Sequence, residues 1–277
     1  MSGILYVIGT PIGNLGDITS RAIEILSEVD FIAAEDTRVT GKLLRAFDIS
    51  KPMVSYHHHN RAERGMQIVE RLKDGQSCGL ITDAGTPCIS DPGFELVNLC
   101  HENNIPVNSV PGPSAVTTAL SVCGMSAERF IFEGFLPANS SHRVKRLEEI
   151  KDWPHTLVFY EAPHRLKSTL KDMLGVLGDR KIALVKELTK IYEGVTRTTL
   201  KDAADTIIPK GEFVIIVSGR TDEIVVDYAA ALQAAAGIAA RLHNDGIPLS
   251  QAAKEAAKET GIKKGDIYKF CIELSED

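Results

Sequence analysis

Eight short motifs combine residue types that could hold a small polar ligand and move protons around it. In chain order they are IGTPIGN (8–14), AEDTR (34–38), SYHHHN (55–60), TDAGTP (82–87), VPGPSA (110–115), FEGFLP (132–137), FYEAPHR (159–165) and KELTK (186–190). Small residues let a ligand approach the backbone closely, while carboxylates and histidines supply acid and base groups. No Ser-His-Asp order or nucleophilic cysteine stands out, so covalent catalysis is not indicated.

The first motif has the position of a dinucleotide-binding turn, because Glu35 and Asp36 follow it by about 20 residues. Its glycines are spaced G-x-x-x-G-x-x-G, however, and Pro11 removes an amide donor that a pyrophosphate would need. A tight strand-to-helix turn is the alternative.

Three consecutive histidines occupy positions 57–59. Neighbouring residues of an extended segment point to alternate faces, so we predict no metal site and expect one histidine to reach a ligand together with Asn60. Glu35, Asp36 and Arg38 either position a substrate or form a solvated strand end.

Short apolar runs precede the motifs, and we expect these runs to be strands. In the first part of the chain they span 3–8, 31–34, 53–56, 78–81 and 106–110. Helices are expected between them, one capped by Thr19 or Ser20 and one with Pro92 as its first residue. Strands separated by helices imply a mostly parallel sheet, whose ligand crevice lies at the carboxyl ends of the strands.

A second series of strands is expected at 130–132, 156–160, 182–185, 195–200 and 213–217, with helices at 141–151 and 162–177. From Tyr228 the chain becomes alanine-rich and helical, with Ser250 as an N-cap and Gly261 as a helix-ending residue. We therefore predict an α/β protein with two α/β lobes (1–115 and 116–222), a ligand cleft between them and a small helical C-terminal module (223–277). This module is either a helix-turn-helix-like RNA contact or an added packing or dimer element.

The formal charge of −6 argues against a protein that coats nucleic acid or an anionic membrane. Residues 139–201 nevertheless hold 13 basic and 8 acidic residues, so we expect a basic surface there. Its members are Arg143, Lys145, Arg146, Arg165, Lys167, Lys186 and Lys190. Five scattered cysteines, no signal sequence and no long apolar stretch indicate a cytoplasmic protein without a membrane span.

In order and spacing, the eight motifs closely resemble those of the ribosomal RNA small subunit methyltransferase I family. Its members are the 16S rRNA (cytidine-2′-O)-methyltransferases of the tetrapyrrole-methylase superfamily. The resemblance implies a two-lobe fold, S-adenosylmethionine as methyl donor between the lobes, the small ribosomal subunit as substrate and a homodimer. It further implies donor contacts at Ile12, Ala84, Gly85, Thr86, Ile89, Ser114, Ala115, Glu161 and Leu188. Porphyrin-type members have Asp in place of Thr86 and Met in place of Glu161, which speaks against a tetrapyrrole substrate.

The implied chemistry is an in-line attack of the ribose 2′-oxygen on the donor methyl group, helped by a base that removes the hydroxyl proton. By position, the candidate bases are Asp36, His57, Glu161 and Glu187. Arg38, Arg165 and Lys190 would hold phosphate or orient the ribose.

Two other functions remain open at this point. One is a methyltransferase of the same fold that acts on a small molecule or a protein side chain. The other is a non-catalytic ribosome-assembly factor that binds the donor as a ligand. The AEDTR and YHHHN motifs favour the ribosomal branch.

Overall fold

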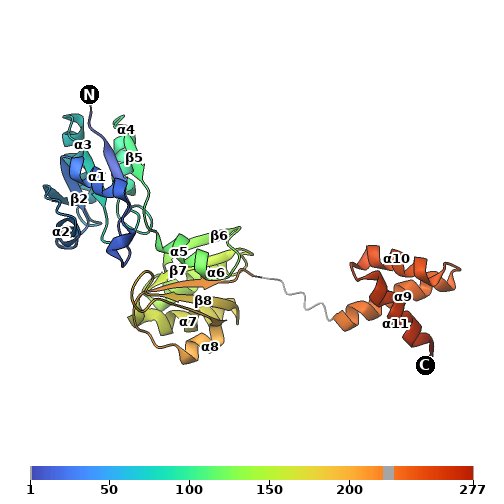
Figure 1. The fold of residues 1–277 in the computed structure, drawn as a ribbon. Coiled ribbons are helices and arrows are strands. Elements are labelled where there is room, and N and C mark those ends of the chain that lie inside the picture. The colour runs from blue at the N-terminus through green and yellow to red at the C-terminus, as the bar shows by residue number, and fades with distance from the viewer. Residues whose placement is uncertain (1, 221–227, 277) are drawn as a thin grey trace. The chain divides into compact units, whose positions relative to one another are not determined.

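The computed structural model describes residues 2–220 and 228–276 (Figure 1). Its contacts group into two compact units that divide after Arg220. The first unit contains two five-stranded sheets and the second contains three helices. The α/β fold with two sheets and C-terminal helices is therefore confirmed, whereas the lobe boundary after residue 115 stays a prediction.

The first sheet is entirely parallel, with strand order β3-β2-β4-β1-β5. Its strands are β1 (Leu5–Ile8), β2 (Phe31–Ala34), β3 (Met53–Ser55), β4 (Cys78–Ile81) and β5 (Val107–Val110). The helical segments between and after them are η1 (Leu15–Asp17), α1 (Ser20–Glu28), α2 (Thr37–Ala46), α3 (Arg61–Lys73) and α4 (Phe94–Glu102). All five predicted strands are confirmed, with ends that differ by at most two residues.

Apolar residues on both faces of these strands explain the layering. Along β2, Phe31 and Ala33 pack with residues of α3 and α4, while Ile32 and Ala34 pack with residues of α1 and α2. A strand covered on both faces must be apolar at every position, which is why the inner strands β1, β2 and β4 are continuous apolar runs. The edge strand β5 instead carries the exposed Asn108 and Ser109. The sheet is consequently the middle layer between two layers of helices.

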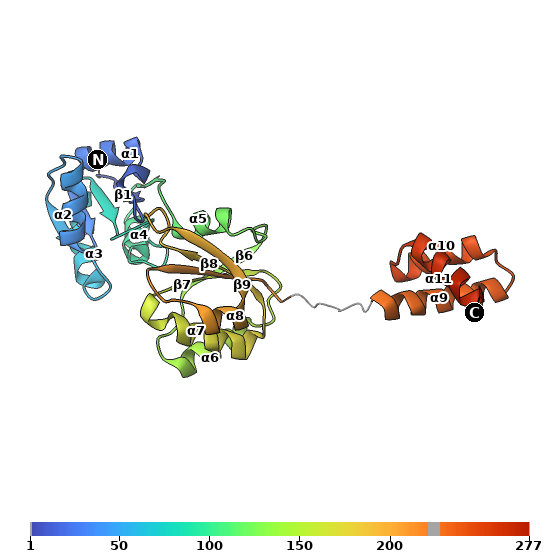
Figure 2. The same ribbon diagram turned by 60° about the horizontal axis from the view of Figure 1, so that its bottom comes forward.

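The second sheet is mixed, with strand order β6-β7-β10-β8-β9. Its strands are β6 (Phe130–Phe135), β7 (Thr156–Glu161), β8 (Lys181–Lys186), β9 (Gly194–Thr199) and β10 (Phe213–Val217). Its helices are α5 (Ala115–Val122), α6 (Ser140–Ile150), α7 (Pro163–Leu177) and α8 (Leu200–Thr206). Helix α5 packs on one face, and α6, α7 and α8 pack on the other (Figure 2).

Two predicted helix starts are wrong. Helix α4 begins at Phe94, not at Pro92, because Gly93 adopts a φ of 144° that no helix contains. Helix α10 (Leu249–Thr260) begins directly after Pro248, so Ser250 lies inside its first turn and is not the N-cap. By contrast, Thr19 caps α1 by accepting a hydrogen bond from the Ala22 amide at 3.1 Å.

The second unit consists of α9 (Tyr228–Asn244), α10 and α11 (Lys264–Glu276). Its core includes five alanines of α9 and α10 together with Ile262 and Ile267. Alanine brings helix axes close together, and Gly261 ends α10 in the left-handed conformation as predicted, with a φ of 74°. Among the described residues, no helix is long and apolar enough to cross a membrane.

Backbone contacts join the loops that follow β1, β4 and β5. Thr10 and Gly85 exchange backbone hydrogen bonds of 2.8 and 3.1 Å, which tie the first loop to the fourth. Gly9 and Gly112 approach so closely that a Cβ added to Gly112 would lie 2.7 Å from the Gly9 carbonyl oxygen. The three loops are therefore in direct backbone contact, and the Thr86 hydroxyl adds a hydrogen bond of 3.1 Å to the Pro113 carbonyl oxygen.

We expect Gly112→Ala to lower the free energy of unfolding by about 1–3 kcal/mol, because the added methyl group overlaps the Gly9 backbone. The matched control is Gly175→Ala in α7, where a Cβ meets nothing within 4 Å. This control should leave the protein unchanged or stabilise it by up to about 1 kcal/mol. Urea denaturation of both variants measures the difference, and equal midpoints would contradict the close contact.

Candidate functional site

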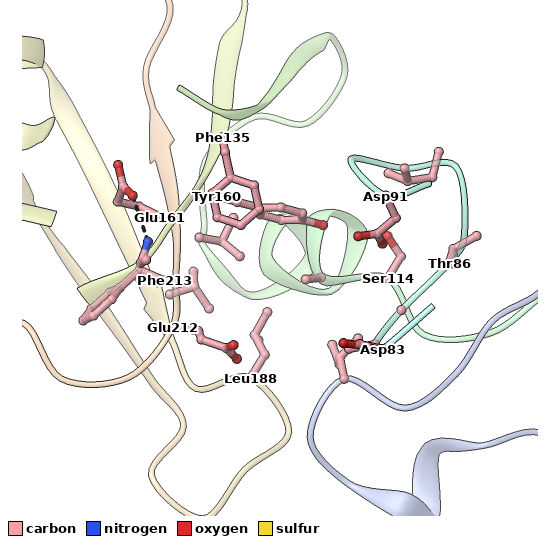
Figure 3. Close-up of a pocket in the computed structure, with 18 of the residues that line it drawn as sticks. Asp83, Thr86, Asp91, Ser114, Phe135, Tyr160, Glu161, Leu188, Glu212 and Phe213 are labelled. Carbon is pink, nitrogen blue, oxygen red and sulfur yellow. Dashed lines mark hydrogen bonds between the residues drawn. The ribbon is translucent and has the colours of Figure 1, made fainter. Parts of the chain in front are cut away.

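A cavity of about 340 Å³ lies in the first unit, where loops from both sheets meet (Figure 3). Its lining includes all nine positions that the family resemblance assigns to the methyl donor. The lining residues are Ile12, Glu35, Asp83, Ala84, Gly85, Thr86, Ile89, Asp91, Ser114, Ala115, Phe135, Tyr160, Glu161, Ala162, Val185, Leu188, Glu212, Phe213 and Val214.

Strand order explains which loops reach the cavity. In the first sheet β1 lies between β4 and β5, so their three carboxyl-end loops adjoin, and β2 beside β4 adds Glu35. In the second sheet β6, β7 and β8 run in one direction and β10 runs in the other. The carboxyl ends of those three strands therefore share an edge with the start of β10, which adds Phe213.

The first loop and the KELTK loop approach each other closely. A Cβ on Gly13 would lie 2.6 Å from Lys190 Cγ and 2.9 Å from the Leu188 carbonyl oxygen. Glu187 and Thr189, on either side of Leu188, have positive φ values of 50° and 64°. Residues other than glycine adopt this conformation at some cost, so the loop that presents Leu188 to the cavity is strained.

Bonds to the Glu187 carboxylate hold that strained loop. The carboxylate accepts hydrogen bonds from the Glu212 amide at 2.9 Å and from Lys190 Nζ at 3.1 Å. The Glu212 amide and then Lys190 lower the pKa of Glu187. Glu187 and Lys190 thus support the cavity wall from behind, and neither lines the cavity.

Among the described residues that line the cavity, every charged side chain is acidic. Burial raises the pKa values of Glu35 and Asp83, and burial followed by the charge of Glu35 raises the pKa of Asp91 to about 6. Glu35 accepts a hydrogen bond from the Asp83 amide at 3.4 Å, and Asp83 accepts one from the Asp36 amide at 3.1 Å. Asp91 has a weak contact of 3.5 Å with the Thr82 hydroxyl. The acid wall therefore favours a cationic ligand.

The buried Glu161 carboxylate has both hydrogen-bond and ion-pair partners. Its carboxylate accepts hydrogen bonds from the Thr169 hydroxyl at 2.5 Å and from the Ala162 amide at 2.8 Å, and it forms an ion pair with Arg165 at 3.2 Å. Arg165 in turn donates to the Leu136 carbonyl oxygen at 2.6 Å. These two residues connect β7 to the turn that follows β6.

Asp36 and Arg38 lie at the start of α2. The Asp36 carboxylate caps the helix by accepting from the Arg38 amide at 2.8 Å, and it also pairs with the Arg38 guanidinium at 2.6 Å. Hydrogen bonds from Arg38 hold the pKa of Asp36 well below its usual range. Neither residue lines the cavity.

The three histidines follow β3, which is an edge strand separated from β4 by β2, so none of them lines the cavity. Asn60 accepts from the His57 amide at 2.9 Å and donates to the Ser55 carbonyl oxygen at 3.1 Å, which closes the loop on itself. The roles predicted for His57 and Asn60 toward a ligand stay predictions.

Four of the seven basic residues expected on the surface of residues 139–201 form ion pairs. Arg143 is buried and pairs with Asp172 at 2.6 Å, and Arg146 pairs with Glu133 at 2.8 Å. Arg165 pairs with Glu161, and Lys190 pairs with Glu187. Among the described members of the expected surface, Lys145, Lys167 and Lys186 form no ion pair.

Most of the acidic partners belong to the same segment. Asp172, Glu161 and Glu187 lie within residues 139–201 and were already counted in its charge sum. Of the described partners, only Glu133 and Glu212 come from outside this segment.

Several lining residues were missed as site residues in the sequence analysis. Phe135 and Tyr160 lie inside the motifs FEGFLP and FYEAPHR, but aromatic residues at strand ends usually indicate core packing. Asp91 lies inside the longer segment TDAGTPCISDPG (82–93), which carries part of the family resemblance, but the resemblance assigns it no role. Phe213 and Val214 belong to a strand whose antiparallel direction the sequence did not predict.

Comparison with known proteins agrees with this architecture. Residues 4–204 match the family model of the Tetrapyrrole (Corrin/Porphyrin) Methylases, and residues 230–275 match that of the RsmI C-terminal HTH domain. A conserved hypothetical protein from Aeropyrum pernix K1 has a similar structure, with a TM-score of 0.64 at 17% identity over 81% of this chain and 87% of that one. Uroporphyrin-III C-methyl transferase from Thermus thermophilus has a TM-score of 0.56 at 17% identity, over 77% of this chain and 96% of that one.

Closer relatives define the particular family. Ribosomal RNA small subunit methyltransferase I of Haemophilus influenzae is 45% identical over 98% of this chain and 96% of its own length. The protein of the same name from Synechocystis is 43% identical over 99% of both chains. The chain therefore belongs to the ribosomal RNA small subunit methyltransferase I family and is a methyltransferase.

Removal of Glu161 should be strongly destabilising, because it leaves the Arg165 charge largely buried without its partner. We expect Glu161→Ala to cost about 3 kcal/mol or more of unfolding free energy, and the double variant with Arg165→Ala to recover part of that cost. The control is Glu149→Ala, whose half-exposed carboxylate pairs with Arg146 and should cost less than about 1 kcal/mol. A denaturant-based double-mutant cycle without coupling would contradict the role of this pair.

Proposed function

We propose that this protein transfers a methyl group from S-adenosylmethionine to the 2′-hydroxyl of a cytidine in 16S rRNA of the small ribosomal subunit. The names of relatives 42–46% identical over nearly the full chain are the main support for an rRNA substrate. The sequence resemblance supports the cytidine 2′-oxygen, and it also supports a cytoplasmic homodimer.

The residues of the cavity fit the proposed donor. Gly85 has a φ of 82°, and a Cβ there would lie 3.5 Å from Ile12 Cγ2, so the missing side chain leaves room at the wall. The acid wall suits the sulfonium and ammonium groups of the donor. A structural neighbour from the superfamily, the Thermus thermophilus enzyme, is described as complexed with S-adenyl homocysteine. We propose that the nine positions from Ile12 to Leu188 named above hold the donor.

When bound, S-adenosylmethionine supplies an electrophilic methyl group on a positively charged sulfur. Asp91 is our proposed proton acceptor. Its carboxylate lines the cavity and lacks a strong partner among the described residues, and burial raises its pKa to about 6. Asp91 takes the proton of the 2′-hydroxyl as the oxygen bonds to the methyl carbon and the carbon–sulfur bond breaks with its electron pair on sulfur.

The other predicted catalytic residues take supporting positions in this proposal. Hydrogen bonds lower the pKa values of Asp36 and Glu187, which makes these two carboxylates weaker proton acceptors than Asp91. The Glu161 carboxylate is occupied by Thr169, the Ala162 amide and Arg165. Arg38, whose side chain is 87% exposed, is our proposed contact to RNA phosphate.

The proposed activity predicts a defined product. Purified protein incubated with S-adenosylmethionine carrying a labelled methyl group should label 16S rRNA in small subunits taken from cells that lack the gene. Nuclease digestion and mass analysis should then identify 2′-O-methylcytidine. Large subunits serve as the control. Label on a base, or no label in 16S rRNA, would contradict the proposal.

The proposed role of Asp91 as proton acceptor predicts how turnover depends on pH. Because the ionised carboxylate accepts the proton, the rate should fall as the pH drops through about 6, where Asp91 becomes protonated. Asp91→Asn should lower kcat by about 10²–10⁴-fold and remove this acid limb. The exposed Asp205→Asn in α8 is the control. An unchanged pH profile in Asp91→Asn, with the donor still bound in calorimetry, would exclude Asp91.

A further inference from the structure

The rings of Phe135 and Tyr160 lie together on one wall of the cavity (Figure 3). The Tyr160 ring contacts Phe132 and Phe135 edge to face, with centroid distances of 4.9 and 5.5 Å. Phe132 is partly buried against the core of α5, whereas Phe135 is 55% exposed although it lines the cavity. The donor-binding positions do not use this exposed ring.

A bulge in β6 creates this arrangement. Residues three apart in a regular strand point to opposite faces, yet Phe132 and Phe135 both contact Tyr160. The pairing of β6 with β7 shifts between Phe132 and Gly134, and Gly134 has a φ of 63°. The extra residue turns Phe135 to the same side as Phe132, as bulges commonly do beside functional sites.

The turn after Phe135 is firmly held. Arg165 donates to the Leu136 carbonyl oxygen at 2.6 Å, and Arg143 donates to those of Pro137 and Ala138 at 3.2 and 3.1 Å. Both arginines are fixed by carboxylates, Arg165 by Glu161 and Arg143 by Asp172. The exposed ring is therefore preorganised, which lowers the entropic cost of binding a flat ligand.

The bulge also contacts the loop of the proposed base. A Cβ on Gly134 would lie 2.4 Å from Ser90 Oγ, and Ser90 directly precedes Asp91. In Figure 3 the Tyr160 hydroxyl points toward Asp91 across the cavity. Phe135 and Asp91 thus line the same cavity from opposite sheets.

We propose that Phe135, backed by Tyr160, is the stacking platform for the nucleobase of the acceptor nucleotide, which enters the cavity unpaired. This inference rests on the proposed function. The acidic lining repels phosphate, so the base and ribose are the parts of a nucleotide that suit the cavity. Aromatic side chains bind unstacked bases in this way, and enzymes that modify a nucleotide commonly extrude it from its stack.

The test compares Phe135→Ala, Phe135→Leu and Phe135→Trp, with small ribosomal subunits as substrate. Loss of the ring in the first two variants should raise KM for the subunits by about 5- to 150-fold, as expected for one stacked base. Phe135→Trp should retain the wild-type KM within a few-fold. The Kd for S-adenosylmethionine, measured by calorimetry without RNA, should be unchanged in all three. The matched control is Phe130→Ala, a partly exposed phenylalanine at the other end of β6 that does not line the cavity.

Each other outcome overturns a specific claim. If Phe135→Leu has the same KM as the wild type, an apolar side chain is sufficient to bind the substrate. The proposal of a stacking platform would then be wrong. It would also be wrong if Phe135→Ala behaved like Phe130→Ala, or if its effect accompanied a change in oligomeric state in sedimentation velocity. A wild-type protein that methylates no small-subunit RNA would instead overturn the proposed function.

Discussion

The cavity depends on the close backbone contact between the loops that follow β1, β4 and β5. Gly9 touches Gly112, and Thr10 forms a two-hydrogen-bond bridge with Gly85, so the wall is made of main chain with little side-chain volume. A backbone wall has fixed donors and acceptors, because the strands beneath it fix their directions. The central position of β1 in its sheet brings these three loops together, and thus the site follows from strand order as much as from motif composition.

Three carboxylates inside the cavity and three arginines outside it differ in whether they form ion pairs. The carboxylates of Glu35, Asp83 and Asp91 line it without forming an ion pair among the described residues, whereas Arg143 and Arg146 on α6 and Arg165 on α7 are paired. A cation enters such a cavity favourably, and an anionic backbone stays outside. Arg143 and Arg165 donate hydrogen bonds to the turn after Phe135. These two side chains therefore stabilise the conformation of the site and are less available to bind a polyanion.

The sequence predicted the strands well, because buried strands are continuous apolar runs that require no knowledge of their neighbours. Seven of the eight motifs contribute residues to the cavity lining, and SYHHHN is the exception. Features that depend on distant contacts were not predicted. The late start of α4 depends on Gly93, where an added Cβ would lie 2.7 Å from Cys88 Sγ. The β6 bulge depends on pairing with β7. Asp91 becomes distinctive only through burial beside Glu35, which no local pattern records.

The position of β10 in its sheet has a consequence for synthesis on the ribosome. The first sheet has all its strands once residue 110 is made, and its contacts can form early. In the second sheet, β10 pairs with both β7 and β8 but comes after both in the chain. Until residue 217 emerges, these two strands have unpaired edges, which are the surfaces that aggregate most readily. The second core and the part of the cavity wall that β10 supplies can therefore be completed only after residue 217 is made.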